Sequence, residues 1–529
     1  MDGTQGPSKW LTLAAVCLGL GMLMIDTFVV NVALPAIGRN LDASLSATEW
    51  VVTGYVLVLG VFPVAMGRLG DIFGRRRIYI AGLAVFVASS LACGLAPNIE
   101  MLILGRVVQG LGAATMMPLT LSIITNAFPA EQRGLAIGTW GGVSGLGLLA
   151  GPILGGLLVD GDNWRWIFLV NLPVGAIAVA AAMLFVAESR DESTPRRVDV
   201  TGLAVLTAML LLFILAINRG NHLGWGSPQI VGSFALAAVL LPVFIAVERR
   251  VRAPLVDLSL FRSGSFVAAC ASALLFSAAV FGSQPFTSLL MQNTWGFTPL
   301  EGGLAFIPAT AIVALLMPVS GIMAQRLGSR MRLLIIAGSL LVLASFVLLL
   351  RITTASGYVD GLLGPFLLRG LGIGLVMSAA SYAAVTSAPL AKSGLAAGTL
   401  TMSRQLGTSI GVAIFGAVFV HSVAGGLPPE LETLPPAEAA AIAEQAERFN
   451  PGTDPALAEP LEQTIIDGFV VISAVGVGIA ALAAATAWLI RMREPARPGV
   501  PAATEAAANP VVTAPAPPEP RKGQGTPGR

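Results

Sequence analysis

Apolar runs of about 18 to 25 residues recur along almost the whole 529-residue chain, and they limit its possible folds more than any other feature. A helix rises 1.5 Å per residue, so each run can cross the roughly 30 Å hydrocarbon core of a bilayer. Only 11% of the residues are charged, against about 25% in soluble domains. The sequence therefore predicts an all-α polytopic membrane protein with fourteen spans.

The two halves of the chain look like degenerate copies of one unit. Residues 67–77 read GRLGDIFGRRR, and residues 321–332 read GIMAQRLGSRMR, with a glutamine where the first copy has Asp71. Later in each half, an arginine is followed by glycines, at Arg106 in the first half and at Arg369 in the second. Internal repeats of this kind are common in transporters. We predict two six-helix bundles with two additional helices between them.

Composition places the boundaries of these parts. The predicted parts are 1–187 for the N-terminal bundle, 188–262 for charged linkers and the two additional helices, 263–493 for the C-terminal bundle with an external loop at 422–465, and 494–529 for a disordered tail rich in Pro, Ala and Gly. Lys and Arg gather in the loops on one side, which predicts that both termini are cytoplasmic. The formal charge of +2 gives no sign of a nucleic-acid partner.

Asp26 lies deep in the first apolar run, and Arg106 lies at a similar depth in the fourth. Ionisable residues inside a membrane usually face the bundle interior and are candidates for function. A carboxylate whose surroundings change can load and release a proton. Two interpretations stay open, a proton-coupling pair and a structural ion pair.

In two further motifs, the positions of the glycines predict local structure. In GLLAGPILGG, small residues four apart share one helix face and the proline favours a bend, which predicts a tightly packed helix. Its residues are Gly147, Gly151, Pro152, Gly155 and Gly156. In the loop at 67–77, the aspartate can accept hydrogen bonds from arginines or cap a helix, and its glycines permit a tight turn.

Together with NWRWIFLVNLPVG, these motifs resemble the signatures of the major facilitator superfamily and are similar to its fourteen-helix drug:proton antiporter branch. The resemblance covers about residues 11 to 493. It implies proton coupling by Asp26 and Arg106 and an exchanger's role for the glycine-proline motif. It also implies a cytoplasmic gate made of Gly67, Gly70, Asp71, Gly74, Arg75, Arg76, Glu131 and Arg133.

The resemblance implies proton-coupled efflux of structurally varied, moderately apolar molecules, with the proton gradient as energy source. No GxxxxGK[ST] sequence is present, so we expect no use of ATP, and we expect neither a cofactor nor enzyme activity. The chain has only two histidines, and its three cysteines lie in apolar runs, so the sequence does not predict a metal site. We expect a monomer in the bacterial cytoplasmic membrane. An uptake symporter of the same architecture stays open as the alternative.

Several polar and aromatic side chains could line a substrate pocket, although helix packing explains each of them as well. They are Asn31, Trp140, Phe281, Gln284, Arg369 and Arg404. No carboxylate lies deep in a second-half span, whereas the two arginines do. Neutral or anionic substrates therefore have as much weight as cationic ones.

Overall fold

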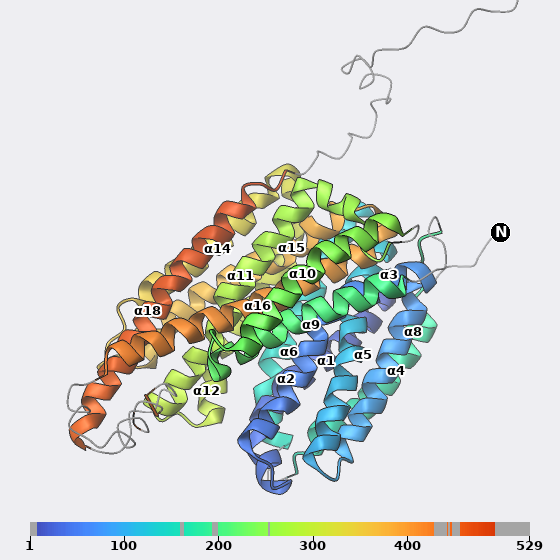
Figure 1. Ribbon diagram of the computed structural model, residues 1–529. Coiled ribbons are helices and arrows are strands. Elements are labelled where there is room, and N and C mark those ends of the chain that lie inside the picture. The colour runs from blue at the N-terminus through green and yellow to red at the C-terminus, as the bar shows by residue number, and fades with distance from the viewer. Residues whose placement is uncertain are drawn as a thin grey trace, which may run out of the picture. The chain divides into compact units, whose positions relative to one another are not determined.

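The structure is a computed structural model that describes residues 8–158, 163–192, 199–251, 254–427, 442, 445–446 and 455–491. Throughout these residues the regular secondary structure is helical (Figure 1). The predicted external loop at 422–465 lies mostly outside the described residues, and the predicted tail at 494–529 lies entirely outside them.

The first half of the chain and the segment that follows it contain ten helices among the described residues. They are α1 (Lys9–Asn40), α2 (Leu45–Val61), α3 (Pro63–Phe73), α4 (Arg75–Gly94), α5 (Ile99–Ala127), α6 (Arg133–Leu158), α7 (Trp166–Leu169), α8 (Asn171–Phe185), α9 (Val200–Leu223) and α10 (Pro228–Arg250). The second half contains α11 (Gly264–Leu289), α12 (Pro299–Ala305), α13 (Ile307–Leu327), α14 (Arg332–Leu349), α15 (Gly364–Thr386), α16 (Ser393–Gly425) and α18 (Pro455–Ala487).

Within the described residues, 11 helical stretches are long and apolar enough to cross a membrane, and the bent pair α2–α3 gives a twelfth. The bend of 51° falls at Pro63, whose ring has no N–H to continue the helix. This count takes α13 and α14 as one stretch, Ile307–Leu349, although a short turn separates them. The polytopic all-α fold is confirmed, and the number of fourteen spans stays a prediction.

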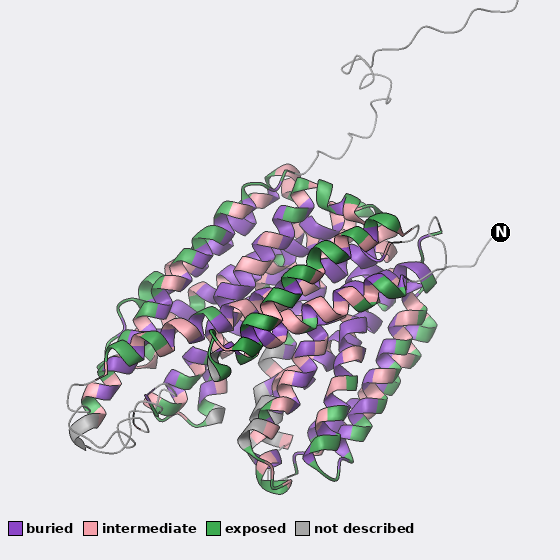
Figure 2. Cartoon of the chain, in the orientation of Figure 1, coloured by how far each residue is buried: buried purple, intermediate pink, exposed green. Residues whose placement is uncertain are grey.

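The additional helices α9 and α10 pack against each other, and α9 also contacts α2 and α16. Figure 2 shows that α10 is largely exposed, and only 17% of its most apolar window is buried. In a membrane, an apolar helix surface of this kind faces lipid. The division of the chain at residues 187 and 262 stays a prediction, because residues 1–492 group into one compact unit by their contacts.

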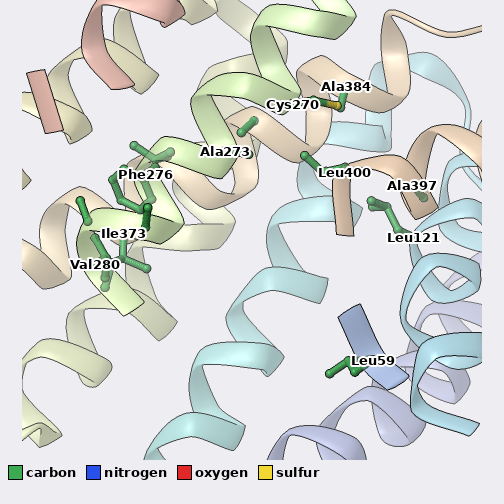
Figure 3. Packing of buried hydrophobic residues seen from close by; sticks show 14 of the residues in the cluster. Leu59, Leu121, Cys270, Ala273, Phe276, Val280, Ile373, Ala384, Ala397 and Leu400 are labelled. Atoms are coloured by element: carbon green, nitrogen blue, oxygen red, sulfur yellow. The ribbon is translucent and has the colours of Figure 1, made fainter. Parts of the chain in front are cut away.

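The apolar core is continuous through the second half. Figure 3 shows Cys270, Ala273 and Phe276 following one another along α11 among buried side chains of α15 and α16. Farther along α11, a Cβ atom on Gly282 would lie 2.6 Å from the Cα atom of Gly411 in α16. Glycine at this crossing lets the two helix backbones approach closely, as is usual between membrane helices.

Candidate functional site

Asp26 of α1 and Arg106 of α5 form an ion pair in the interior of the first half. The distance between Arg106 Nη1 and Asp26 Oδ2 is 2.7 Å, and the two side chains are 1% exposed or less. The other carboxylate oxygen accepts hydrogen bonds from Gln109 Nε2 at 3.0 Å and from Asn171 Nδ2 at 2.8 Å. Three donors from α5 and α8 therefore surround the Asp26 carboxylate.

A second layer of contacts fixes this network. Ser90 Oγ accepts hydrogen bonds from Gln109 Nε2 at 3.3 Å and from Asn171 Nδ2 at 3.0 Å. The ring of Tyr55 lies 4.1 Å from the Arg106 guanidinium carbon. All these groups belong to α1, α2, α4, α5 and α8, so the network lies within the first half. Removing one partner of such a buried pair costs about 3–5 kcal/mol, because the other charge is left without compensation.

A second buried carboxylate joins the two halves at the end of α3. Asp71 Oδ1 accepts a hydrogen bond from the backbone N–H of Gly394 at 3.0 Å, and Oδ2 accepts one from Leu395 at 2.9 Å. These amides belong to the first turn of α16, where free N–H groups and the helix dipole favour an anion. Arg75 Nη2 donates to Asp71 Oδ1 at 2.6 Å. We call this end of the bundle the Asp71 end.

Arg75 and two serines extend the contact between the halves. Arg75 is 1% exposed, and its Nη2 also donates to the backbone carbonyl of Ala391 at 2.7 Å. Ser122 of α5 and Ser393 of α16 are joined by a hydrogen bond of 2.7 Å. The Asp71 end is therefore closed by polar contacts between helices of the first and second halves.

The glycines near Asp71 differ in what they permit. A Cβ atom on Gly67 would overlap the backbone carbonyl of Gly394, so this position has room only for hydrogen. A Cβ atom on Gly70 would overlap only the end of the flexible Leu119 side chain, which would have to shift. Gly74, between α3 and α4, has a φ of 114°, a conformation that residues with a side chain rarely adopt.

The remaining predicted gate residues do not contact Asp71 in the described part of the chain. The Arg76 side chain donates to the backbone carbonyl of Met183. Arg133 Nε donates at 3.1 Å to a backbone carbonyl just after α5. Glu131 is exposed, and both Glu131 and Arg133 act electrostatically on Tyr382 of α15. These two residues are thus near the second half, but at a different seam from Asp71.

Gln325 repeats the arrangement of Asp71 in the second half. Its Oε1 accepts a hydrogen bond of 2.7 Å from the backbone N–H of Gly134, in the first turn of α6. A Cβ atom on Gly321 would overlap the Gly134 carbonyl. The end of α13 therefore caps α6 as the end of α3 caps α16, with a neutral amide in place of the carboxylate.

A third contact ties the loop after α10 to the start of α16, through an ion pair between Asp257 and Lys392. Burial alone would raise the pKa of Asp257, but hydrogen bonds from Lys392 and Ser259 outweigh it and lower that pKa to about 2. Because the pKa is lowered, the ion pair is complete above the ordinary value of 3.8 and is lost only as the pH falls through about 2. It does not titrate near neutral pH.

The glycine-proline motif packs within the first half. Cβ atoms on Gly147 and Gly151 would overlap or press against the side chains of Met24 and Phe28 of α1. Pro152, Gly155 and Gly156 belong to α6, but their surroundings lie outside the described part. The described glycines of the motif thus permit the predicted close approach, and their partner is α1 and not the other half.

A different glycine row of α6 forms the seam with α13. A Cβ atom would lie 2.7 Å from Pro318 Cα if added to Gly138, and 3.0 Å from the Ala314 carbonyl if added to Gly142. Gly134 and Gly138 face Gly321 at the Asp71 end. Glycines four residues apart lie on one helix face, so the sequence contained this signal.

Replacing Gly138 by Val is expected to open this seam. The added atoms overlap the α13 backbone, and overpacking of this kind costs about 1–3 kcal/mol. We therefore expect disulfide cross-linking of a Ser122→Cys/Ser393→Cys pair to slow by about fivefold or more. The three native cysteines are buried, and Gly232→Val in α10, where nothing lies within 4 Å, is the matched control. Equal cross-linking rates in the Gly138→Val and Gly232→Val variants would contradict a role of the α6–α13 contact in holding the two halves together.

A cavity of about 80 Å³ lies between the two halves, and three predicted pocket residues line it: Phe281, Gln284 and Arg369. Phe28 of α1 lines it from the first half. Val280 and Ile373, which also line it, lie side by side in Figure 3. We call this cavity the Arg369 pocket.

The other predicted pocket residues do not line this cavity. Trp140 is buried, and its Nε1 donates to Thr120 Oγ1 at 2.9 Å. Arg404 Nη2 donates to Ser381 Oγ at 2.8 Å and to a backbone carbonyl of α15. The side chain of Asn31 lies outside the described part of the chain. Trp140 and Arg404 instead hold neighbouring helices together.

Comparison with known proteins assigns the chain to a family. The family model described as Major Facilitator Superfamily matches residues 16–412. The chain belongs to the major facilitator superfamily. This membership confirms the resemblance seen in the sequence, and with it a transporter of small molecules in the membrane and not an enzyme.

Relatives within the superfamily span most of the chain. A multidrug resistance protein, Stp, of Mycobacterium tuberculosis is 37% identical over 81% of this chain and 79% of its own length. A tetracenomycin C resistance and export protein of Streptomyces glaucescens is 34% identical over 93% and 94%. A probable actinorhodin transporter of Streptomyces coelicolor is 36% identical over 79% and 74%.

Solved structures share the fold at low sequence identity. A human organic anion transporter superposes with a TM-score of 0.60 at 15% identity, covering 92% of this chain and all of that one. A proton:xylose symporter gives 0.60 at 13% identity, covering 92% and 97%.

Several members of this transporter's buried network were not singled out from the sequence. Gln109 and Asn171 are neutral amides inside the motifs LGRVVQGLGAA and NWRWIFLVNLPVG, and Ser90 lies in an apolar run. A neutral amide or hydroxyl in a membrane span costs less than a charge, so it stands out less in the sequence. A search for every amide at the depth of Asp26 would have found the first two.

Proposed function

We propose that this transporter exports structurally varied, moderately apolar molecules in exchange for protons, by alternating access between its halves. The buried network around Asp26 is the observation that carries the proposal. It places a buried, hydrogen-bonded carboxyl group inside a span, where ionisable residues are costly and are candidates for function. Alternating access also requires a contact between the halves that forms and breaks, and in this proposal the Asp71 end is that contact.

Proton exchange at Asp26 requires a change of conformation. A proton bound to Asp26 would neutralise the carboxylate and leave Arg106 charged at a site that is about 1% exposed. That cost falls when water reaches the pair, so protonation favours the conformation that hydrates it. In exchange, one proton supplies about 2.3 kcal/mol per 100 mV and about 1.4 kcal/mol per pH unit.

The relatives support the direction of transport. Their names contain multidrug resistance, tetracenomycin C resistance and export, and actinorhodin transport. We infer that this chain exports antibiotics or similar compounds from a bacterial cell. In this proposal the protein is a monomer in the cytoplasmic membrane, both termini and the Asp71 end face the cytoplasm, and the energy comes from the proton gradient without ATP or a cofactor.

Inverted membrane vesicles test this function. Vesicles that contain the full-length protein are expected to accumulate dyes or antibiotics when their interior is acidified, and to lose them when a protonophore removes the gradient. Right-side-out vesicles with the natural gradient should release the same compounds. Gradient-driven accumulation in right-side-out vesicles would instead establish the uptake symporter.

A further inference from the structure

We propose that the Arg369 pocket binds the anionic head of an aromatic substrate, so that the exported compounds include aromatic carboxylates. The proposal rests on the proposed function and adds to it the charge of the substrate. Its basis is one buried cation that has no anionic partner among the described residues and lines a cavity.

Arg369 lies in α15, and its side chain is buried, with 5% exposed. Among the described residues, its Nε and Nη2 atoms have no hydrogen-bond partner, and no ion pair includes it. The ring centroid of Phe346 lies 4.7 Å from the guanidinium carbon. One cation–π contact compensates only part of the cost of burying a charge, so this site has an unused capacity to bind an anion.

Two other arginines at similar depth of burial provide the comparison. Arg106 and Arg75 are each 1% exposed, and each is paired with an aspartate at 2.7 Å or less. Arg68 and Arg404 are buried as well, and neither forms an ion pair among the described residues; Arg404 instead donates hydrogen bonds to α15. Arg369 lines a cavity, which is the arrangement of a site whose anion comes from outside.

The lining of the pocket matches the body of an aromatic ligand. Phe306 and Phe366 lie stacked, with ring centroids 4.8 Å apart and planes at 17°. Phe281 and Gln284 complete the apolar wall and offer one amide. None of the described residues that line the cavity is a carboxylate, so a cation would meet the guanidinium without compensation.

The volume limits what the pocket holds in this conformation. About 80 Å³ has room for roughly two to three water molecules of about 30 Å³ each, or for a carboxylate head. The body of a larger ligand must therefore extend from the pocket along the aromatic side chains.

Phe28 links the pocket to the Asp26 network. It lines the cavity from α1, two residues after Asp26, whose side chain points into the first half. One helix thus touches both the substrate and the buried ion pair. A ligand that displaces Phe28 acts directly on the helix that carries the carboxylate.

An anionic substrate changes the electrical balance of the cycle. Exchange of one proton inward for one anion outward moves two charges in the same sense. Because about 59 mV corresponds to a tenfold ratio per charge, a change of about 59 mV should alter the accumulation ratio of an anion about 100-fold. The same change should alter the ratio of a neutral compound about tenfold, and that of a monocation not at all.

The test compares binding of three probes that share one ring system, with the purified full-length protein and no gradient. The probes are 2-naphthoate, its neutral methyl ester, and the cationic (2-naphthylmethyl)trimethylammonium. We expect the wild type to bind 2-naphthoate at least about tenfold more tightly than the ester, and the cation least. Equal binding of acid and ester by the wild type would overturn the proposal.

Variants locate the effect. Arg369→Gln should weaken 2-naphthoate binding about 30-fold or more and leave the ester unchanged, whereas Arg369→Lys should keep the preference for the acid. Arg351→Gln removes an exposed second-half charge and is the matched control. Because Arg369 forms no ion pair among the described residues, Arg369→Gln should melt no lower than the wild type, whereas loss of an arginine in a structural ion pair would lower the melting temperature.

The outcomes separate this inference from the proposed function. Selective binding of 2-naphthoate without gradient-driven transport would leave the pocket in place and reject the proton exchanger. Proton-driven efflux of neutral dyes, with no preference for the acid in binding, would leave the exchanger in place and reject the anion pocket.

Discussion

Replacement of Asp26 by Asn is expected to abolish proton-driven accumulation of substrate in inverted vesicles, while downhill exchange continues. The amide of Asn has the shape of the carboxylate but cannot carry the charge that alternates during coupling. It also leaves Arg106 without its counter-ion at a buried site. We therefore expect the free energy of unfolding to fall by about 3–5 kcal/mol, measured as a loss of thermal stability of the purified protein.

The double variant Asp26→Asn/Arg106→Gln separates the two effects. It removes both charges at similar volume, so most of the lost stability should return, as expected for a double-mutant cycle on a buried pair. Coupling should not return. Gradient-driven accumulation by the double variant would mean that Asp26 and Arg106 are a structural ion pair only.

Replacement of Asp71 by Asn is expected to shift the transporter away from the conformation in which the Asp71 end is closed. The carboxylate binds two amides of α16 and the buried Arg75, and hydrogen bonds to charged groups are each worth about 1.5–3 kcal/mol. Loss of about 2 kcal/mol would reduce the closed population relative to the open one about 30-fold. Efflux should fall by at least about tenfold at equal expression.

Cross-linking measures the shift directly. The Ser122→Cys/Ser393→Cys pair replaces two side chains that are hydrogen-bonded to each other between α5 and α16 when the Asp71 end is closed. With Asp71→Asn the pair should form its disulfide more slowly than in the parent. Asp360→Asn, which neutralises an exposed acid in the second half, should leave the rate unchanged. An unchanged rate with Asp71→Asn would show that the residue is an anchor and not a gate.

The fold and the ion pair follow from strong local signals in the sequence. Apolar runs of membrane-spanning length are enough to predict an all-α polytopic protein. Depth along the predicted spans brings Asp26 and Arg106 to the same level, and the structure joins them at 2.7 Å. Charged residues are conspicuous in spans because their transfer into lipid is expensive.

The partners of Asp71 could not be predicted in the same way. The amides that it binds lie 323 and 324 residues farther along the chain and are backbone groups, which carry no sequence signal. From the sequence, the role of Gln325 could be inferred only from its position, which corresponds to that of Asp71 in the first half. Conversely, Trp140 and Arg404 satisfy the chemical criteria for a pocket but face their helix neighbours, because composition does not set the direction of a side chain.

The ion network and the pocket draw their residues from different parts of the chain. The network around Asp26 is built from α1, α2, α4, α5 and α8, whereas the described residues that line the Arg369 pocket, apart from Phe28, belong to the second half. Substitutions selected by a new toxic compound can therefore accumulate in α11, α13 and α15 and leave the residues around Asp26 intact. A transporter with this division can evolve to expel a different compound while the residues that power the expulsion stay the same.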